Sequence, residues 1–107
     1  MLTDLNGLHH VTSVAGAPRA VDRFWREVMG LRRVKTTVNF DDPSVYHLYF
    51  GDRIGTPGTV MTHFPFPHAA RGQQGTGETG HIAFSIPPGS AGDWEAHLAR
   101  HDVPVTR

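Results

Sequence analysis

The segment Leu8–Val14 reads Leu-His-His-Val-Thr-Ser-Val, an alternation rich in β-branched residues that predicts a β-strand. Its residues would be divided between two faces, with Leu8, His10, Thr12 and Val14 on one and His9 and Val11 on the other. Gly16 and Ala17 interrupt the alternation. Pro18 suits a first helical turn because the N–H that proline lacks would have no partner there. We therefore expect a strand followed directly by a helix.

The expected helix runs from Pro18 to a C-terminal cap at Gly30. Its apolar residues recur at i, i+3, i+4, i+7 and i+8 and form one stripe, made of Val21, Phe24, Trp25, Val28 and Met29. Charged residues on the other side can pair four positions apart, Asp22 with Arg26 and Arg23 with Glu27. The aromatic side chains of the stripe, together with Trp94 of a later helix, are expected in the core.

Three more strands are predicted after this helix, over residues 32–40, 45–50 and 59–64. The turn at 41–44 contains two aspartates, a proline and a serine, and the loop at 51–58 contains three glycines and a proline. The prediction for the first part of the chain is thus one βαβββ unit over 1–67.

A second unit starts after a Gly-rich linker, 68–80. Residues 80–86 alternate like a strand, and Ser90 with Asp93 resembles a capping box that opens a helix through Trp94 and Leu98. Strand, break and helix thus recur after about seventy residues. The part 81–107 has room only for the start of a second unit, and the fold class expected is α+β.

The composition excludes several classes of partner. Ten Lys and Arg balance ten Asp and Glu, so no field attracts nucleic acid or anionic lipid. No targeting segment or membrane span is found, and a cytoplasmic protein is expected. With eight histidines and no cysteine, a transition metal would be held by imidazole and carboxylate, which suit Fe(II), Mn(II), Ni(II) or Zn(II).

Several motifs resemble those of the vicinal-oxygen-chelate superfamily, which includes glyoxalases, bleomycin-resistance proteins and extradiol dioxygenases. The segments Gly7–Thr12, Tyr46–Phe50 and Gly55–Thr62 are most similar to the opening of bacterial ring-cleaving dioxygenases of the hydroquinone type. The resemblance implies paired βαβββ units forming a mixed, cupped sheet with helices outside. It also implies an Fe(II) held by two histidines and one carboxylate, where an aromatic diol and dioxygen bind.

Residue by residue, the resemblance makes His10 a metal ligand and places His9 and Thr12 in the substrate pocket. The resemblance places the family's remaining ligands in a unit downstream of Arg107, so we expect an N-terminal fragment whose own residues do not complete the metal site. By analogy with glyoxalase-type relatives, His81 is a candidate second ligand. For the missing carboxylate position, His63 and Thr62 are the alternatives.

Two other functions remain open at this stage. One is a metal-free binding module of the bleomycin-resistance type, a homodimer in which Tyr46, Tyr49 and Phe50 face an aromatic ligand. The other is a glyoxalase-like metal enzyme, which would require His81. In each case the partner is a small molecule, and the rest of the cup comes from a second copy or from further modules.

Overall fold

The order of elements in the computed structural model, which describes residues 3–107, is that of a βαβββ unit followed by one helix. The first unit, within 1–69, contains β1 (His10–Ala15), α1 (Pro18–Arg23), η1 (Phe24–Val28), β2 (Arg32–Val38), β3 (Tyr46–Gly51) and β4 (Val60–Pro65). The second unit, 70–107, contains α2 (Ala91–Arg100). None of the helices among the described residues is long and apolar enough to cross a membrane.

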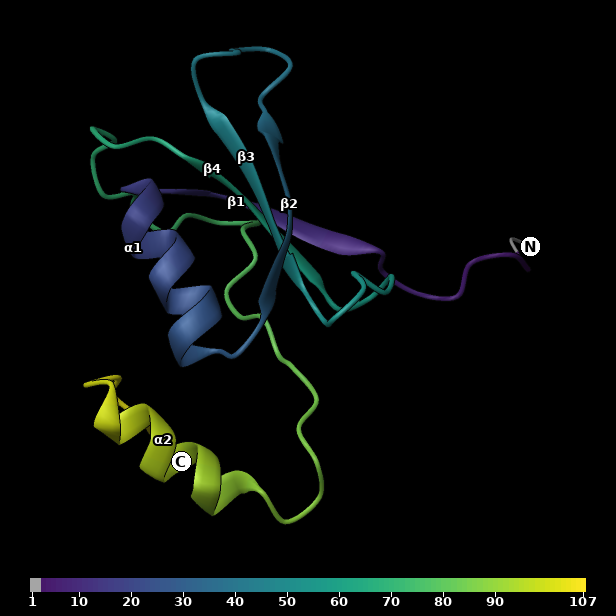
Figure 1. The fold of residues 1–107 in the computed structure, drawn as a ribbon, viewed down its shortest axis with the longest axis vertical. Coiled ribbons are helices and arrows are strands. Elements are labelled where there is room, and N and C mark those ends of the chain that lie inside the picture. Colours follow the sequence, from purple (N-terminus) through teal and green to yellow (C-terminus); the bar gives the residue numbers. More distant parts are fainter. Residues whose placement is uncertain (1–2) are drawn as a thin grey trace. The chain divides into compact units, whose positions relative to one another are not determined.

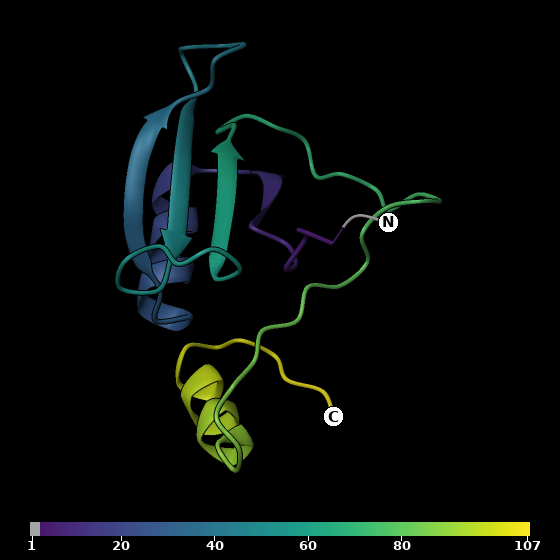
Figure 2. The same ribbon diagram turned by 90° about the vertical axis from the view of Figure 1, so that its right-hand side faces the viewer.

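The four strands form one mixed sheet in the order β1-β4-β3-β2 (Figure 1). β1 runs parallel to β4, and β3 runs antiparallel to both β4 and β2. The expected α+β class and the βαβββ order are therefore confirmed. Helix α1 covers one face of this sheet. In Figure 2 the helix lies behind the strands, and the opposite face, called the open face below, is toward the viewer.

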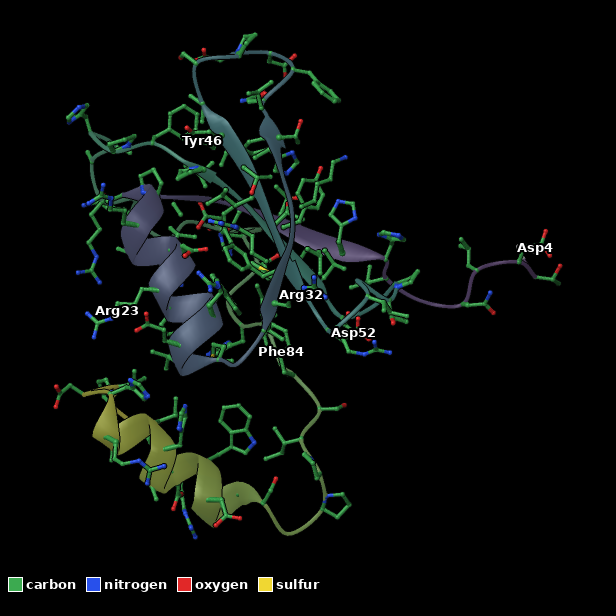
Figure 3. All side chains as sticks on the ribbon, in the orientation of Figure 1. Asp4, Arg23, Arg32, Tyr46, Asp52 and Phe84 are labelled. Atoms are coloured by element: carbon green, nitrogen blue, oxygen red, sulfur yellow. The ribbon has the colours of Figure 1, made fainter. Side chains whose placement is uncertain are left out.

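The core lies between α1 and the sheet. Phe50 is fully buried (0% exposed) and packs with Leu48 and Val21, and Trp25 is packed against this cluster. Leu48 and Phe50 are two residues apart on β3, so both point to the helix, while His47 and Tyr49 point to the open face. The predicted ion pairs decorate the outer side of the helix, where Arg23 contacts Glu27 (Figure 3).

The helix departs from the prediction after its first turns. Residues 24–28 form a π-helical turn in which the Met29 N–H donates to the Phe24 carbonyl, five residues back, at 2.9 Å. The wider turn rotates the side chains away from a 3.6-residue period. Phe24, the first residue of this turn, is 37% exposed, and the expectation that it lies in the core is wrong.

Two strands also differ from their predicted form. β1 begins at His10, and Leu8 before it is 77% exposed. β2 contains a register irregularity between Arg33 and Lys35, which shifts its alternation. Val38 is therefore 39% exposed and Phe40, past the end of the strand, is 89% exposed.

The second unit contains α2 as expected, but residues 81–86 do not form the predicted strand. A strand is stabilised by backbone hydrogen bonds to a neighbouring strand, and apolar residues alone do not make a segment a strand. The capping box is also absent: the Ser90 hydroxyl donates to the Pro87 carbonyl, and its oxygen accepts no hydrogen bond from a backbone N–H of the first helical turn. Trp94 is half-buried, less than predicted.

Candidate functional site

A group of polar and aromatic side chains gathers on the open face of the sheet. The register places Thr12 of β1 beside Thr62 of β4, and Thr62 beside Tyr49 of β3. Residues at these positions share one face because neighbouring strands keep their pleats in phase. The group comprises His10 and Thr12 from β1, Lys35 from β2, His47 and Tyr49 from β3, and Thr62 and Phe64 from β4.

A continuous chain of hydrogen bonds joins three of these strands. The hydroxyls of Thr12 and Thr62 are 2.7 Å apart, and Thr62 Oγ1 lies 3.0 Å from His47 Nε2. The other ring nitrogen of His47, Nδ1, lies 3.0 Å from the Tyr49 hydroxyl. Thr62 is fully buried, whereas Thr12 is exposed. The chain therefore connects the surface at Thr12 with the phenol of Tyr49 through one imidazole.

The environment of His47 favours its neutral form. Burial lowers the pKa of this imidazole below its usual value, and the nearby charges of His10 and Lys35 lower it further. The ring also stacks on Phe64, with centroids 4.0 Å apart, and Lys35 Nζ lies 5.3 Å from the centroid of the Tyr49 ring. The stacking on Phe64 restricts the imidazole of His47, and the Lys35 contact is made to its hydrogen-bond partner Tyr49.

A neutral imidazole has one N–H donor and one acceptor nitrogen, so the series of hydrogen bonds from Thr12 to Tyr49 can run in either of two directions. In one orientation Tyr49 donates to Nδ1, His47 donates to Thr62, and Thr62 donates to Thr12. In the other, each donor becomes an acceptor and the Tyr49 hydroxyl proton points outward. Switching between the two orientations moves a proton between the Thr12 hydroxyl and the Tyr49 hydroxyl. A site that binds a phenol and exchanges its proton needs such a path.

His10 lies at the exposed start of β1, next to this chain. Its Nδ1 is 3.0 Å from Nδ1 of His9, and the two rings meet edge to face with centroids 5.2 Å apart. The loop between β3 and β4 fixes this segment, since the Gly58 N–H donates to the His9 carbonyl at 2.7 Å. Asp52 organises the same loop, because its carboxylate accepts from the backbone N–H groups of Ile54 and Thr56 (Figure 3).

Gly58→Ala tests this support. Gly58 has a φ of +90°, and an added Cβ would lie 3.4 Å from the Leu8 carbonyl oxygen, so the substitution is strained chiefly by its backbone conformation. We expect a loss of about 1–3 kcal/mol in the free energy of unfolding, measured by urea titration. Gly72→Ala is the control because φ there is ordinary and nothing lies within 4 Å of the added Cβ. Equal stability of the two variants would show that the loop does not constrain the His9 segment.

The structure separates residues that the sequence left as alternatives. Thr62, not His63, faces the open side next to Thr12. His63 faces the helix, is 4% exposed and hydrogen-bonds Ser13 at 2.8 Å, so it cannot supply a ligand on the open face. Alternation along β4 is the reason.

The aromatic residues expected to face a ligand are divided in the same way. Tyr49 is on the open face, but Phe50 is in the core. Tyr46 lies at the start of β3, at the opposite end from Asp52, and lines a hollow on the helix side together with Leu48 (Figure 3). The prediction that all three face one ligand is therefore wrong.

That hollow, of about 420 Å³, is the second place where a ligand could be held. It is lined by residues of α1, η1, β2 and β3, and most of its charged side chains form ion pairs. Asp22 contacts both Arg26 and Arg33, and Arg23 contacts Glu27. The open face offers the chemistry of imidazole, phenol and hydroxyl groups and is the better candidate site.

The structure supplies only part of the metal-binding site that the sequence predicts. The described residues contain no group of three or more His, Cys, Asp or Glu side chains that could hold an ion. The open face carries the imidazoles of His10 and His47, but both ring nitrogens of His47 are engaged with Thr62 and Tyr49. The imidazole of His10 alone does not fit a three-ligand site. His81 belongs to the second unit and its role as a ligand stays a prediction.

His47 and Tyr49 are the site residues that sequence reasoning undervalued. Both belong to the Tyr46–Phe50 motif, and their alternation with Leu48 and Phe50 was visible. The sequence did not show which residue of another strand lies next to His47. Its contact with Thr62 depends on β4 lying between β1 and β3.

Comparison with known proteins gives consistent results at two levels of similarity. No protein-family model matches the chain. It is 52% identical over 94 residues to the "Putative ring-cleaving dioxygenase MhqE" of Bacillus subtilis (strain 168), covering 88% of this chain and 31% of that protein. It is 36% identical over 104 residues to the chlorohydroquinone/hydroquinone 1,2-dioxygenase of Sphingobium indicum, covering 95% of this chain and 32% of that protein. The chain thus spans about a third of the length of these curated relatives.

Solved structures extend the likeness to the fold. The crystal structure of a dioxygenase from Bacillus subtilis, described there as putative, superposes with a TM-score of 0.89 at 44% identity, over 94% of this chain and 34% of that one. Glyoxalase I of Leishmania major gives a TM-score of 0.74 at 18% identity, over 96% and 71% of the two chains. The fosfomycin resistance protein FosX of Listeria monocytogenes gives 0.69 at 14% identity, over 96% and 75%. At such low identity these last two share the fold.

Proposed function

The chain belongs to the vicinal-oxygen-chelate superfamily and matches the N-terminal part of longer ring-cleaving dioxygenases, and from this premise we propose that it contributes half of the substrate cup of such an enzyme. The substrate would be a small aromatic diol of the hydroquinone type. The observation that supports the proposal is the hydrogen-bonded chain from Thr12 to Tyr49, which gathers the groups needed to hold phenolic hydroxyls beside His10.

In this proposal the open face orients the diol. One hydroxyl of the substrate would donate to the Thr12 hydroxyl. The Thr12 proton can in turn point toward Thr62, because the series of hydrogen bonds from Thr12 to Tyr49 has two orientations. Neutral His47 makes the switch possible, since an imidazolium would only donate. His9 and the aromatic surface of Phe64 and Tyr49 would confine the ring.

A divalent metal, Fe(II) in first place and Mn(II), Ni(II) or Zn(II) as alternatives, would supply activation of the diol and of dioxygen. His10 would contribute one ligand. The other ligands would come from outside the first unit, with His81, further modules or a second copy of the chain as their source. No catalytic step is assigned to the residues of this chain beyond binding the diol and holding its proton.

Binding of hydroquinone tests the proposal directly. Titration followed by NMR is expected to shift the resonances of Thr12, His47 and Tyr49 and to leave those lining the hollow near Tyr46 unchanged. Thr12→Val should weaken binding about fivefold, because one net hydrogen bond contributes about 1 kcal/mol. His68→Ala, in an exposed coil, is the control and should bind as the native chain does.

Shifts centred on the hollow, or no saturable shifts at millimolar hydroquinone, would contradict the proposed site. The metal part is tested separately by anaerobic Fe(II) titration of the native chain and of His10→Ala. Tight binding of about one ion per chain or per dimer that disappears in the variant would show that the chain assembles its own metal site. Binding that is the same in both would remove His10 from the ligand set.

A further inference from the structure

One face of α2 carries a row of three aromatic side chains that the proposed function does not use. Trp94, His97 and His101 follow one another at i, i+3 and i+7, so they lie above each other along the helix. The ring centroids of His97 and His101 are 4.7 Å apart with planes inclined by 59°, and those of Trp94 and His97 are 5.8 Å apart at 88°. Both imidazoles are half-buried.

Two histidines four residues apart on a helix have the spacing with which helices present an imidazole pair to zinc. The tilted arrangement of His97 and His101 keeps their rings close without face-to-face stacking. Imidazole is a ligand that suits copper, nickel, iron and zinc. We propose that His97 and His101 chelate one first-row divalent transition-metal ion, at a site that uses no residue of the first unit.

The electrostatics of this end of the helix support a cation. His101 is the C-terminal cap of α2, where the partial negative charge of the helix dipole is concentrated. The carbonyls of Leu98 and Ala99 point past this end and accept the N–H groups of His101, Asp102 and Val103. Two arginines lie near this end. Arg100 precedes His101 in the last turn, and the guanidinium of Arg107 is paired with the carboxylate of Glu95 at 2.8 Å, which offsets its charge.

Trp94 provides a reporter next to the pair. The chain has two tryptophans, so a Trp25→Phe variant leaves Trp94 as its indole. Titration with Ni(II) or Cu(II) is expected to quench this fluorescence to saturation at one ion per chain, with Cu(II) the tighter of the two. In that background His97→Gln and His101→Gln should each raise the Kd at least about tenfold, equivalent to about 1.4 kcal/mol. His68→Gln is the matched control and should leave the Kd unchanged.

Equilibrium dialysis of the native chain with Ni(II) gives a second measurement that does not depend on Trp25→Phe. His101→Gln should lose one bound ion per chain, whereas His10→Ala and His81→Gln should keep it. Circular dichroism checks that α2 persists in the glutamine variants. Quenching of Trp94 that survives both glutamine substitutions, or an ion that disappears with His10→Ala or His81→Gln, would overturn the proposal.

Discussion

Phe50→Ala is expected to unfold most of the first unit. Phe50 is fully buried at the centre of the cluster with Leu48 and Val21, and its ring lies against Trp25 with centroids 6.5 Å apart and planes inclined by 27°. Removing a buried phenylalanine ring costs about 3–5 kcal/mol, because transfer free energy is lost and the neighbours collapse only partly into the space. Small domains have about 5–15 kcal/mol in total, and a unit of this size falls at the low end.

Phe40→Ala is the matched control, since it deletes the same ring from a position that is 89% exposed. It should change the free energy of unfolding by no more than about 0.5 kcal/mol. Urea denaturation followed by Trp25 fluorescence measures both variants, and the hydrogen-bonded chain on the open face should be lost together with the core in Phe50→Ala. If the two variants were equally stable, the cluster around Phe50 would not be the core of the unit.

Local pattern was sufficient for most of the first unit. The strand over 45–50 was predicted, although the assignment of Tyr49 and Phe50 to one ligand ignored its alternation, and the apolar stripe correctly placed Val21 and Val28 in buried positions. It failed where the backbone departs from a regular period. Neither the π-helical turn at Phe24 nor the irregularity in β2 has a signal in its side chains, because both are set by how the helix and strand fit the sheet.

The second unit shows a different limit. Residues 81–86 have the composition of a strand, but a strand is stabilised by a neighbour, and the pattern of one segment says nothing about whether the neighbour is there. The candidate site was limited in the same way. His10 and Thr12 were identified by resemblance, whereas the partners of Thr12 depend on the parallel pairing of β1 with β4, fifty residues away in sequence. The choice between His63 and Thr62 likewise stayed open until that register was known.

His63 should also make the first unit sensitive to acid. Burial lowers the pKa of His63 to about 4 in the folded state, against the usual 6.5 of an imidazole in water. Its Nδ1 is hydrogen-bonded to Ser13, but among the described residues its buried Nε2 has no hydrogen-bond partner. The Trp25 ring stacks at 5.2 Å and could stabilise an imidazolium, but such contacts contribute about 0.5–2 kcal/mol. Desolvation corresponds to more than this, because one pKa unit is about 1.4 kcal/mol.

The direction of the pH effect follows from the two pKa values. Above pH 6.5 both states are neutral at His63, and stability is complete. As the pH falls below 6.5 the unfolded chain takes up a proton that the folded chain refuses, so stability is lost until about pH 4, where the folded state is protonated as well. Between pH 7 and pH 4.5 the free energy of unfolding should fall by about 2–3 kcal/mol from this group alone.

His63→Asn isolates the contribution, because the asparagine amide can keep the hydrogen bond to Ser13 and does not titrate. Urea denaturation at intervals from pH 7 to pH 4.5 should show the native chain losing stability more steeply than His63→Asn, while His68→Asn, exposed in the coil, follows the native slope. Carboxylates that titrate in this range are present in all three proteins and cancel in the comparison. Parallel loss in the native chain and His63→Asn would mean that His63 accepts a proton in the folded state as easily as in the unfolded one, and the buried, unpaired Nε2 would then have to be solvated.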